Sequence, residues 1–468
     1  MFFSKKFFLL IAILLSSLAS FSQIESNGST IVNISEITID GNQITKEKVI
    51  YRELLFKQGD KISLDELPVL ISKSRDNLLN TSLFNFVTID YTIDLNNIKF
   101  SIKFQERWYI WPYPVLEHTD RNLSSFLRNA EWSRVDYGLF VLINNFRGRK
   151  EILKLKTIFG YNEELVLHYY KPFIDKKQKI GFGFEFDYFQ NHEVSYGISN
   201  DKLEYLKLNS KYARNTLRIS NFYSYRPYVY TSHVIDFRYI KVSVNDSVFD
   251  LNNNYFFDQR NQIEFFTIIY DVDYDKRDSK IYPLKGYRIN FSATKNGIHI
   301  LSGKGNFVLK TILEENYQIS NRFFLNTSFL AQANFNNNNS FYFSEAIGYD
   351  NYLRGMEYYA SNGDSYYISK TNFKFGIIPQ TKFNLNFIPS DKFSKVHYAL
   401  YMNLFFDTGY VDSDYTFSNN LTNDFLYSGG IGIDLVAYYD KVLRIEYSLN
   451  KFGEHGIFFH LGAPIIKK

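Results

Sequence analysis

An arginine and an aspartate in two short polar stretches are the residues of this sequence best suited to a strong, directed interaction. Arg354 is followed by Gly355 in a stretch rich in tyrosine, and Asp407 stands two residues before Gly409 in a later stretch. The planar guanidinium of arginine can donate two parallel hydrogen bonds to one carboxylate. These residues therefore predict an ion pair between a loop and a strand, if the fold brings them together.

The sequence lacks the residue patterns that common catalytic sites require. It contains no Gly-x-Ser-x-Gly elbow, no His-Glu-x-x-His pair and no phosphate-binding glycine loop. It has no cysteine, which excludes disulfides, thiolate metal sites and a thiol nucleophile, and its eight histidines are scattered. We therefore expect no enzyme activity, no metal and no cofactor.

Asp407 lies in a run in which large apolar residues alternate with polar or small ones. Alternate side chains of a strand point to opposite faces. Leu404 and Phe406 share the apolar face, whereas Asn403 and Asp407 share the other face. Asp407 should therefore point away from the apolar face, where a charge needs water or a partner such as Arg354.

The same alternation recurs through residues 108–468, between turns rich in Asn, Asp, Gly and Lys. From Ile180 to Tyr188, five large apolar residues share one face, and glycines and acids share the other. Soluble sandwiches alternate in the same way, but here the apolar faces are dominated by Phe, Tyr, Leu and Ile, and the polar faces carry charges. A sheet in lipid cannot leave an edge open and must close on itself. The pattern favours a transmembrane β-barrel.

Composition agrees with a membrane barrel. The 46 Phe and 38 Tyr bring the aromatic share to 19%, which suits girdles of rings at two membrane interfaces. A net charge of +4 is no signal of nucleic-acid binding. Trp108 and Trp111 are expected to anchor the first strand at the inner interface. A stiff linker that contains proline is the plain alternative for this segment.

Residues 1–22 predict a secretory signal, with cleavage before Gln23. Lys5 and Lys6 precede a core of twelve mostly apolar residues. Such a core is too short to span the hydrocarbon layer, which takes about 20 residues. The chain is therefore expected to leave the cytoplasm.

Residues 31–107 predict a small α+β domain. Strand-like alternation changes to helical spacing after a turn at Asp40 and Gly41, and Thr45 is expected to cap the first helix. The expected order is strand, helix, helix, strand, strand, over residues 34–39, 45–56, 64–79, 84–91 and 98–104.

A charged turn precedes the alternating strand that begins at Tyr287. Pro283 lies where it withholds no ladder hydrogen bond, and Gly286 permits a tight bend. The residues that give this turn its character are Asp275, Arg277, Asp278, Tyr282, Pro283 and Gly286.

Three of these features together resemble the BamA/TamA family, which inserts or transports proteins at bacterial outer membranes. Within residues 31–107, the words Ile39-Asp-Gly-Asn42 and Asn80-Thr-Ser-Leu-Phe84 resemble a POTRA domain. The turn ahead of Tyr287 resembles the family's Asp-x-Arg-Asp … Tyr-Pro-x-x-Gly hairpin. The Arg-Gly pair and the Phe-x-Asp-x-Gly strand resemble a lumen loop and the wall that receives it, with Met356 at a place where an aromatic residue is usual.

The resemblance implies a mostly β fold: a closed antiparallel transmembrane β-barrel of about sixteen strands, over residues 108–468, preceded by one POTRA domain. It implies a bacterial outer-membrane location, with the POTRA domain in the periplasm. The expected partners are outer-membrane lipid, unfolded or secreted protein substrates, and accessory proteins of the periplasm or outer membrane. The expected function is to assemble, insert or translocate those substrates by strand augmentation, with the lumen loop braced by Arg354 and Asp407. The alternative is a non-translocating porin-like channel or an accessory structural subunit.

Overall fold

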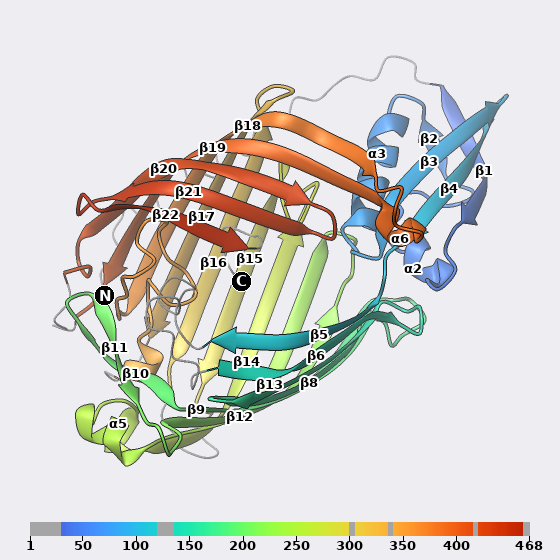
Figure 1. The fold of residues 1–468 in the computed structure, drawn as a ribbon. Coiled ribbons are helices and arrows are strands. Elements are labelled where there is room, and N and C mark those ends of the chain that lie inside the picture. The colour runs from blue at the N-terminus through green and yellow to red at the C-terminus, as the bar shows by residue number, and fades with distance from the viewer. Residues whose placement is uncertain (1–29, 119–134, 299–304, 336–339, 415–419, 462–468) are drawn as a thin grey trace.

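The computed structural model describes residues 30–118, 135–298, 305–335, 340–414 and 420–461. The expected secretory signal at 1–22 lies outside these ranges. Within them, no helix is both long and apolar enough to cross a membrane. Strands dominate: a four-stranded sheet, a two-stranded hairpin and a sixteen-stranded sheet (Figure 1).

The N-terminal domain packs helices against its four-stranded sheet. The sheet order is β2-β1-β4-β3, and β1 is parallel to β4. Apolar side chains from the sheet and the helices, among them Ile34, Phe56, Leu78 and Phe100, form one buried cluster. The elements are β1 (Ile31–Asp40), α2 (Glu47–Tyr51), β2 (Lys61–Ser63), α3 (Leu67–Leu79), β3 (Phe84–Asp94) and β4 (Asn97–Glu106).

Thr45 has a different role from the expected helix cap. Lys46 is the N-cap residue of α2, and no side chain caps this helix. Thr45 Oγ1 instead accepts a hydrogen bond from Asn145 Nδ2 at 2.8 Å and lies 3.0 Å from Tyr109 Oη. Asn145 belongs to the large sheet, so the threonine joins the two domains rather than starting a helix.

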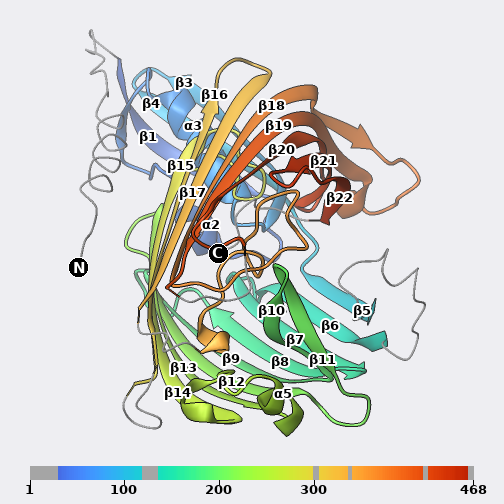
Figure 2. The same ribbon diagram turned by 90° about the vertical axis from the view of Figure 1, so that its left-hand side faces the viewer.

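Sixteen antiparallel strands coil into a barrel that contains most of the chain (Figures 1 and 2). This confirms the predicted fold class, a mostly β chain with about sixteen antiparallel strands behind one small α+β domain. The strands are β5 (Ile110–His118), β6 (Val135–Phe146), β7 (Glu151–Gly160), β8 (Glu163–Lys171), β9 (Ile180–Asn191), β12 (Arg214–Tyr225), β13 (Thr231–Val244), β14 (Gln262–Asp275), β15 (Gly286–Asn296), β16 (Phe307–Gln318), β17 (Phe323–Phe335), β18 (Ser365–Asn384), β19 (Lys395–Asp412), β20 (Phe425–Ala437), β21 (Lys441–Asn450) and β22 (His455–Leu461).

The side chains of the barrel segregate by face as the alternation predicts. On β19, Leu404 and Phe406 are 51% and 54% exposed, whereas Asn403 and Asp407 are 1% and 0% exposed. The outer surface is therefore apolar and the interior polar, which is the arrangement of a transmembrane barrel.

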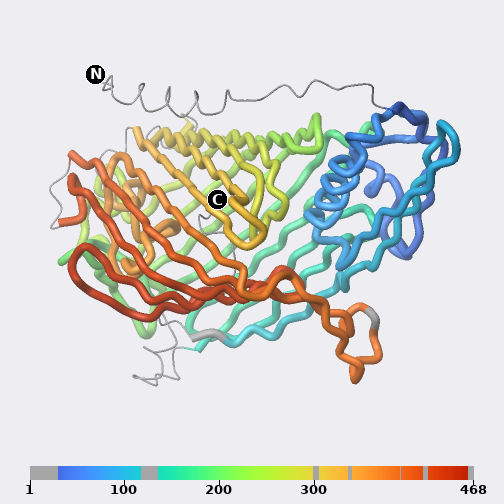
Figure 3. Tube along the Cα trace, turned by 90° about the horizontal axis from the view of Figure 1, so that it is seen from above, coloured from blue at the N-terminus to red at the C-terminus, as the bar shows by residue number. Residues whose placement is uncertain are grey.

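The two ends of the barrel carry different connections. The N-terminal domain lies at one end (Figure 3). There it contacts barrel turns such as 147–150 and 438–440. The opposite end carries the hairpin β10 (Glu193–Ser199) and β11 (Lys202–Lys207), α5 (Asp246–Leu251) and the single-turn helix η2 (Phe257–Gln259). It also carries residues 340–364, here called the lumen loop, which contain η3 (Phe341–Phe343). Helix α6 (Asp391–Ser394) lies back at the first end, between β18 and β19.

The barrel has a seam at its first and last strands. Among the described residues, no backbone pairing joins β5 to β22, and each of them ends the sixteen-stranded sheet. Figure 2 shows these two strands on either side of the seam. Along β22, the side chains of Ile457, Phe459 and Leu461 are largely exposed.

Candidate functional site

Arg354 lies inside the barrel, on the lumen loop, against the wall strand β19. Its Nη2 donates to Asp407 Oδ1 at 2.6 Å, and its Nε donates to Asp407 Oδ2 at 2.9 Å. The backbone N–H of Arg354 also donates to Asp407 Oδ2, at 3.1 Å. Both side chains are almost fully buried. The two residues thus form the bidentate pair that matches guanidinium to carboxylate geometry.

Two further strands complete the site around Arg354. Its Nη1 donates to Asn372 Oδ1 on β18 at 2.6 Å and to Glu446 Oε1 on β21 at 3.1 Å. The guanidinium carbon lies 3.9 Å from the centre of the Phe405 ring, a cation–π contact. We call Arg354, Asp407, Asn372 and Glu446 the lumen lock. It ties one loop to three strands of the wall.

Gly355 and Gly409 allow the loop to approach the wall closely. Gly355 has a φ of +82°, which favours glycine, and a Cβ there would lie 2.8 Å from Ser448 Oγ. A Cβ on Gly409 would lie 2.8 Å from a methyl carbon of Leu353. Met356, at the place where an aromatic residue is usual, is buried in the same cluster as Leu353. The thioether therefore fills the docking site at the loop tip.

Replacing Gly409 by valine should push the loop away from β19 without harming the strand. Valine suits a strand, but its side chain would occupy the space of Leu353. We expect overpacking of about 1–3 kcal/mol against the docked loop. Limited proteolysis of the detergent-purified chain should then cut within 340–364 at least about fivefold faster, because 1 kcal/mol is a factor of about five. The matched variant Gly376→Val, at a glycine of β18 where an added Cβ would meet no atom nearer than 3.7 Å, should leave this rate unchanged.

A second polar cluster lies in the lumen nearer the N-terminal domain. Tyr282 Oη donates to Asp434 Oδ2 on β20 at 2.7 Å. Asp434 also accepts from Arg444 Nε on β21 at 2.7 Å, and Arg444 Nε lies 3.6 Å from Glu446 Oε1. Lys374 Nζ lies 4.0 Å from the centre of the Tyr282 ring. The turn before β15 thus reaches across the lumen and joins the network of the lumen lock.

The other residues predicted in this turn hold its shape. Arg277 binds Asp275 through Nε and Nη2 at 2.9 and 2.8 Å and binds Glu314 at 3.0 Å. Asp278 Oδ1 accepts backbone N–H groups across the turn, among them that of Leu284 at 3.0 Å. The Pro283 carbonyl accepts from Lys374, and Gly286 has a φ of +90°.

Trp108 and Trp111 lie at the junction of the two domains. The Trp111 ring packs edge-on against Tyr439 with centroids 5.0 Å apart, and the backbone N–H of Trp108 donates to Tyr439 Oη at 3.0 Å. Arg107 Nη1 binds Asp440 Oδ2 at 2.5 Å in the same turn. Strand β5 begins only at Ile110, so Trp108 belongs to the junction rather than to the first strand.

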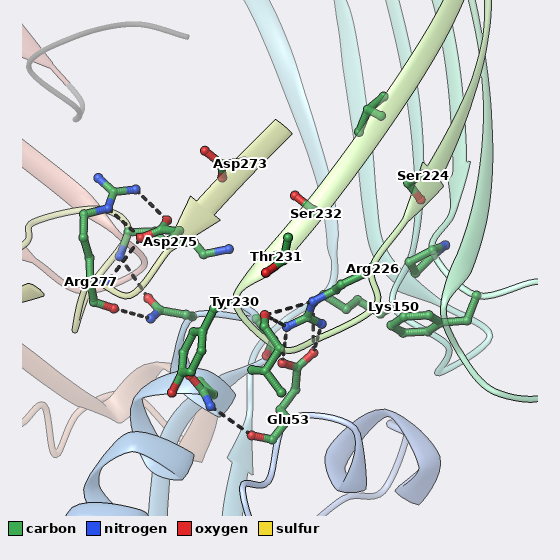
Figure 4. Close-up of a pocket in the computed structure, with 18 of the residues that line it drawn as sticks. Glu53, Lys150, Ser224, Arg226, Tyr230, Thr231, Ser232, Asp273, Asp275 and Arg277 are labelled. Atoms are coloured by element: carbon green, nitrogen blue, oxygen red, sulfur yellow. Dashed lines mark hydrogen bonds and ion pairs between the residues drawn. The ribbon is translucent and has the colours of Figure 1, made fainter. Parts of the chain in front are cut away.

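A second ionic contact between the domains lines a cavity of about 210 Å³ (Figure 4). Glu53 of the N-terminal domain accepts from Arg226 Nη1 and Nη2 at 2.5 and 2.7 Å, and Lys150 Nζ lies 3.7 Å away. Burial alone would raise the pKa of Glu53, but Lys150 and Arg226 outweigh it and lower that pKa to about 2. Arg52 donates to the carbonyls of Gln178 and Arg226.

Sequence reasoning predicted Arg354 and Asp407 but not Glu446, Arg444, Asp434 or the Glu53 contact. The strand alternation gave a partial signal, because it placed Arg444 and Glu446 together on the polar face of their strand. Nothing local to Glu53 indicated its partners, because Arg226 and Lys150 are brought to it by the packing of two domains.

Comparison with known proteins agrees with this architecture. Residues 32–107 match the POTRA family model, described as surface antigen variable number repeat. Over 92% of this chain, the fold matches BamA from Haemophilus ducreyi lacking POTRA domains 1–3, with 13% identity, a TM-score of 0.50 and 84% of that chain covered. It also matches CdiB from Escherichia coli over 92% of this chain, with 8% identity, a TM-score of 0.54 and 76% of that chain covered. A search of curated proteins found no match.

The N-terminal domain is thus a POTRA domain, and the barrel has the fold of BamA and CdiB. These findings confirm the predicted architecture, a POTRA domain followed by a barrel of this fold.

Proposed function

We propose that this protein assembles, inserts or translocates protein substrates at the bacterial outer membrane. The observation that carries the proposal is one POTRA domain docked on a sixteen-stranded barrel whose lumen loop is tied to the wall by Arg354. The resemblance to the BamA/TamA family implies protein substrates. No enzyme reaction is part of the proposal.

Exposed strand edges supply the means of binding. Strand β3 is one of the two outer strands of the POTRA sheet, and its end from 90 to 94 is largely exposed. An unpaired edge presents backbone N–H and C=O groups to which an extended segment can add as a further strand. Affinity then comes from main-chain hydrogen bonds, which suits substrates of varied sequence.

The outward side chains support an outer-membrane location, with the POTRA domain on the periplasmic side. Exposed apolar residues recur on strand after strand, such as Phe237 on β13, Phe291 on β15 and Ile433 on β20. Lipid chains would cover these residues.

An accessory structural subunit is the second candidate, because Glu53 and Arg107 dock the single POTRA domain closely on the barrel. A porin-like channel is less compatible with the lumen, which the lumen loop and Tyr282 enter from opposite ends. Conductance of the purified chain in planar bilayers, measured beside outer-membrane protein levels after depletion, would separate a channel from an assembly factor.

Replacing Arg354 by alanine should impair substrate assembly or secretion while the barrel stays folded. The substitution removes the three side-chain hydrogen-bond partners of the lumen lock but no strand pairing. In cells depleted of the native chain, we expect the variant to restore at most about a tenth of the substrate level, since loss of a buried charge pair costs about 3–5 kcal/mol.

The control is Arg322→Ala, in the short turn between β16 and β17, outside the lumen lock. It should restore the substrate level fully. Heat-dependent gel mobility would report the folded barrel in both variants. Full restoration by Arg354→Ala would remove the lumen lock from the proposed mechanism.

A further inference from the structure

The hairpin of β18 and β19 extends past the wall of the barrel at the end that carries the POTRA domain. Strand β18 leaves its neighbour β17 after Gly376, and β19 meets its neighbour β20 only from Tyr398 onward. Among the described residues, 377–397 therefore find strand partners only within β18 and β19. Figure 3 shows this segment, here called the arm, as the orange projection beside the POTRA domain. A hairpin of two strands is marginally stable by itself, so the arm depends on what covers its two faces.

Two β-bulges keep one face of the arm in line with the outward face of the wall. Relative to β19, strand β18 carries one extra residue on each side of Ile378. Because the two extra residues restore the alternation, Phe383 lies opposite Val396. Val396 shares a face of β19 with Met402 and Leu404, which turn outward on the wall. The outward surface of the barrel therefore continues along the arm.

Large apolar side chains of the arm are exposed. Phe387 near its tip and Phe383 on β18 are 80% and 55% exposed, and Ile377 at its base is 40% exposed. Exposed apolar surface that extends over several side chains marks a contact with a membrane or with another protein. On the arm this surface joins the outward surface of the wall, which lipid would cover, and this continuity favours lipid.

The other side of the arm contacts the POTRA domain. Asn85 Nδ2 donates to the carbonyl of Lys392 at 3.3 Å. The His397 ring lies edge-on to Phe86 with centroids 6.0 Å apart, and Lys382 Nζ lies 4.9 Å from the centre of the Phe86 ring. The arm thus has one side against a folded domain and one exposed apolar face.

The charges and aromatic rings around the arm suit a phospholipid surface. Residues 377–397 contain three lysines and one aspartate, and no glutamate or arginine. Lys392 Nζ lies 5.8 Å from the centre of the Trp108 ring, and Trp111 packs edge-on against Phe393 with centroids 6.2 Å apart. Tryptophan is enriched at the level of the lipid headgroups. A lysine there can lay its stem on apolar surface and keep its ammonium near the phosphates.

We propose that the arm is a membrane-surface anchor, whose outward face lies in the phospholipid of the periplasmic leaflet while its other side holds the POTRA domain. Phe383 and Phe387 enter the boundary between headgroups and acyl chains, and the lysines of the arm reach the headgroup phosphates. The anchor fixes the position of the POTRA domain relative to the bilayer. That the barrel lies in a bilayer rests on the proposed outer-membrane location, whereas the contact of the arm with lipid rests on the face and the charges described above.

Fluorescence quenching by lipid tests the proposal with the full-length chain in nanodiscs. Because the chain has no native cysteine, a single introduced one can carry an environment-sensitive fluorophore. Asn386→Cys places the fluorophore at the exposed tip of the arm and keeps both phenylalanines, Phe406→Cys places it on the outward wall, and Leu95→Cys places it on an exposed turn of the POTRA domain. The nanodiscs contain phosphatidylcholine and phosphatidylglycerol, with a nitroxide either near the top or near the end of the acyl chain.

We expect the quenching at position 386 to approach that at position 406 and to exceed that at position 95. The nitroxide near the top of the acyl chain should quench position 386 more strongly than the one near its end. The reason is that an interfacial segment enters only about 5–10 Å into the boundary between headgroups and acyl chains.

Removing the exposed rings of the arm tests the cause. In the Asn386→Cys chain, Phe383→Ser with Phe387→Ser should lower the ratio of lipid-bound to free arms at least about tenfold, because burial of one phenylalanine is already worth more than that factor. The quenching at position 386 should then fall toward the level at position 95. The matched control is Tyr228→Ser, at a ring that is 72% exposed in the turn between β12 and β13, and it should leave the quenching unchanged.

The outcomes separate the anchor from the membrane location. Quenching at position 406, with quenching at position 386 no stronger than at position 95, would leave the arm to water or to a protein partner and would overturn the anchor alone. Unchanged quenching at position 386 after both phenylalanines are replaced would also overturn it. Absence of quenching at position 406 would overturn the proposed membrane location, and the anchor with it.

Discussion

Replacing Asp407 by alanine should release the lumen loop from the barrel wall. Asp407 accepts three hydrogen bonds from Arg354, including one from its backbone N–H. Without Asp407, the guanidinium keeps Asn372 and Glu446 but loses its bidentate partner in a fully buried place. Removing one partner of a buried pair costs about 3–5 kcal/mol. The docked state of the loop should lose stability by that order, whereas the strand ladders of β19 remain intact.

A single cysteine can report the release. Met356 is 2% exposed, and the chain has no other cysteine to react. In a Met356→Cys background, Asp407→Ala should raise the rate of labelling by a water-soluble maleimide at least about a hundredfold, since 1.4 kcal/mol is a factor of ten. The double variant Arg354→Met, Asp407→Leu removes both charges and should label more slowly than Asp407→Ala. Equal labelling with and without Asp407 would show that the ion pair does not hold the loop.

The sequence predicted the orientation of Asp407 because that information is local. Two-residue alternation along 397–407 decides which face a side chain occupies, whatever the rest of the chain does. The fold class follows from the same pattern repeated over many strands. Pairing Arg354 with Asp407 needed the family resemblance, because a loop residue has no periodicity that could place it.

The rest of the network could not be predicted because it depends on relations between distant strands. Tyr282 meets Asp434 only because the turn before β15 crosses the lumen to β20. Glu446 joins Arg354 because the registers of β19 with β20 and of β20 with β21 place it in one row with Gly432 and Asn403.

Replacing Glu53 by glutamine should loosen the POTRA domain from the barrel. Glutamine keeps the size of the side chain but leaves Arg226 and Lys150 without a buried anion. Lowering the pKa of Glu53 from 4.5 to about 2 corresponds to about 3 kcal/mol in favour of the docked state. The backbone N–H of Lys46, which donates to the Gly148 carbonyl across the domain interface at 2.9 Å, should then exchange with deuterium about a hundredfold faster.

Glu53 also predicts how the docking of the POTRA domain responds to acid, because the direction of its pKa shift fixes the sign of the response. Because the pKa of Glu53 is lower when the domain is docked, its contribution is complete above about pH 4.5 and is lost as the pH falls toward 2. Pepsin, which is active over this range, should cut the native chain between the domains increasingly fast as the pH falls. Glu53→Gln should be cut fast over the whole range, without the additional rise in cleavage rate that the native chain shows as the pH falls. Glu36→Gln, at an exposed ion pair with Lys99, should behave as the native chain does. The test compares the cleavage rate of the native chain with that of Glu53→Gln. If the ratio of the two rates is the same at pH 4.5 and at pH 2, another contact holds the POTRA domain in place.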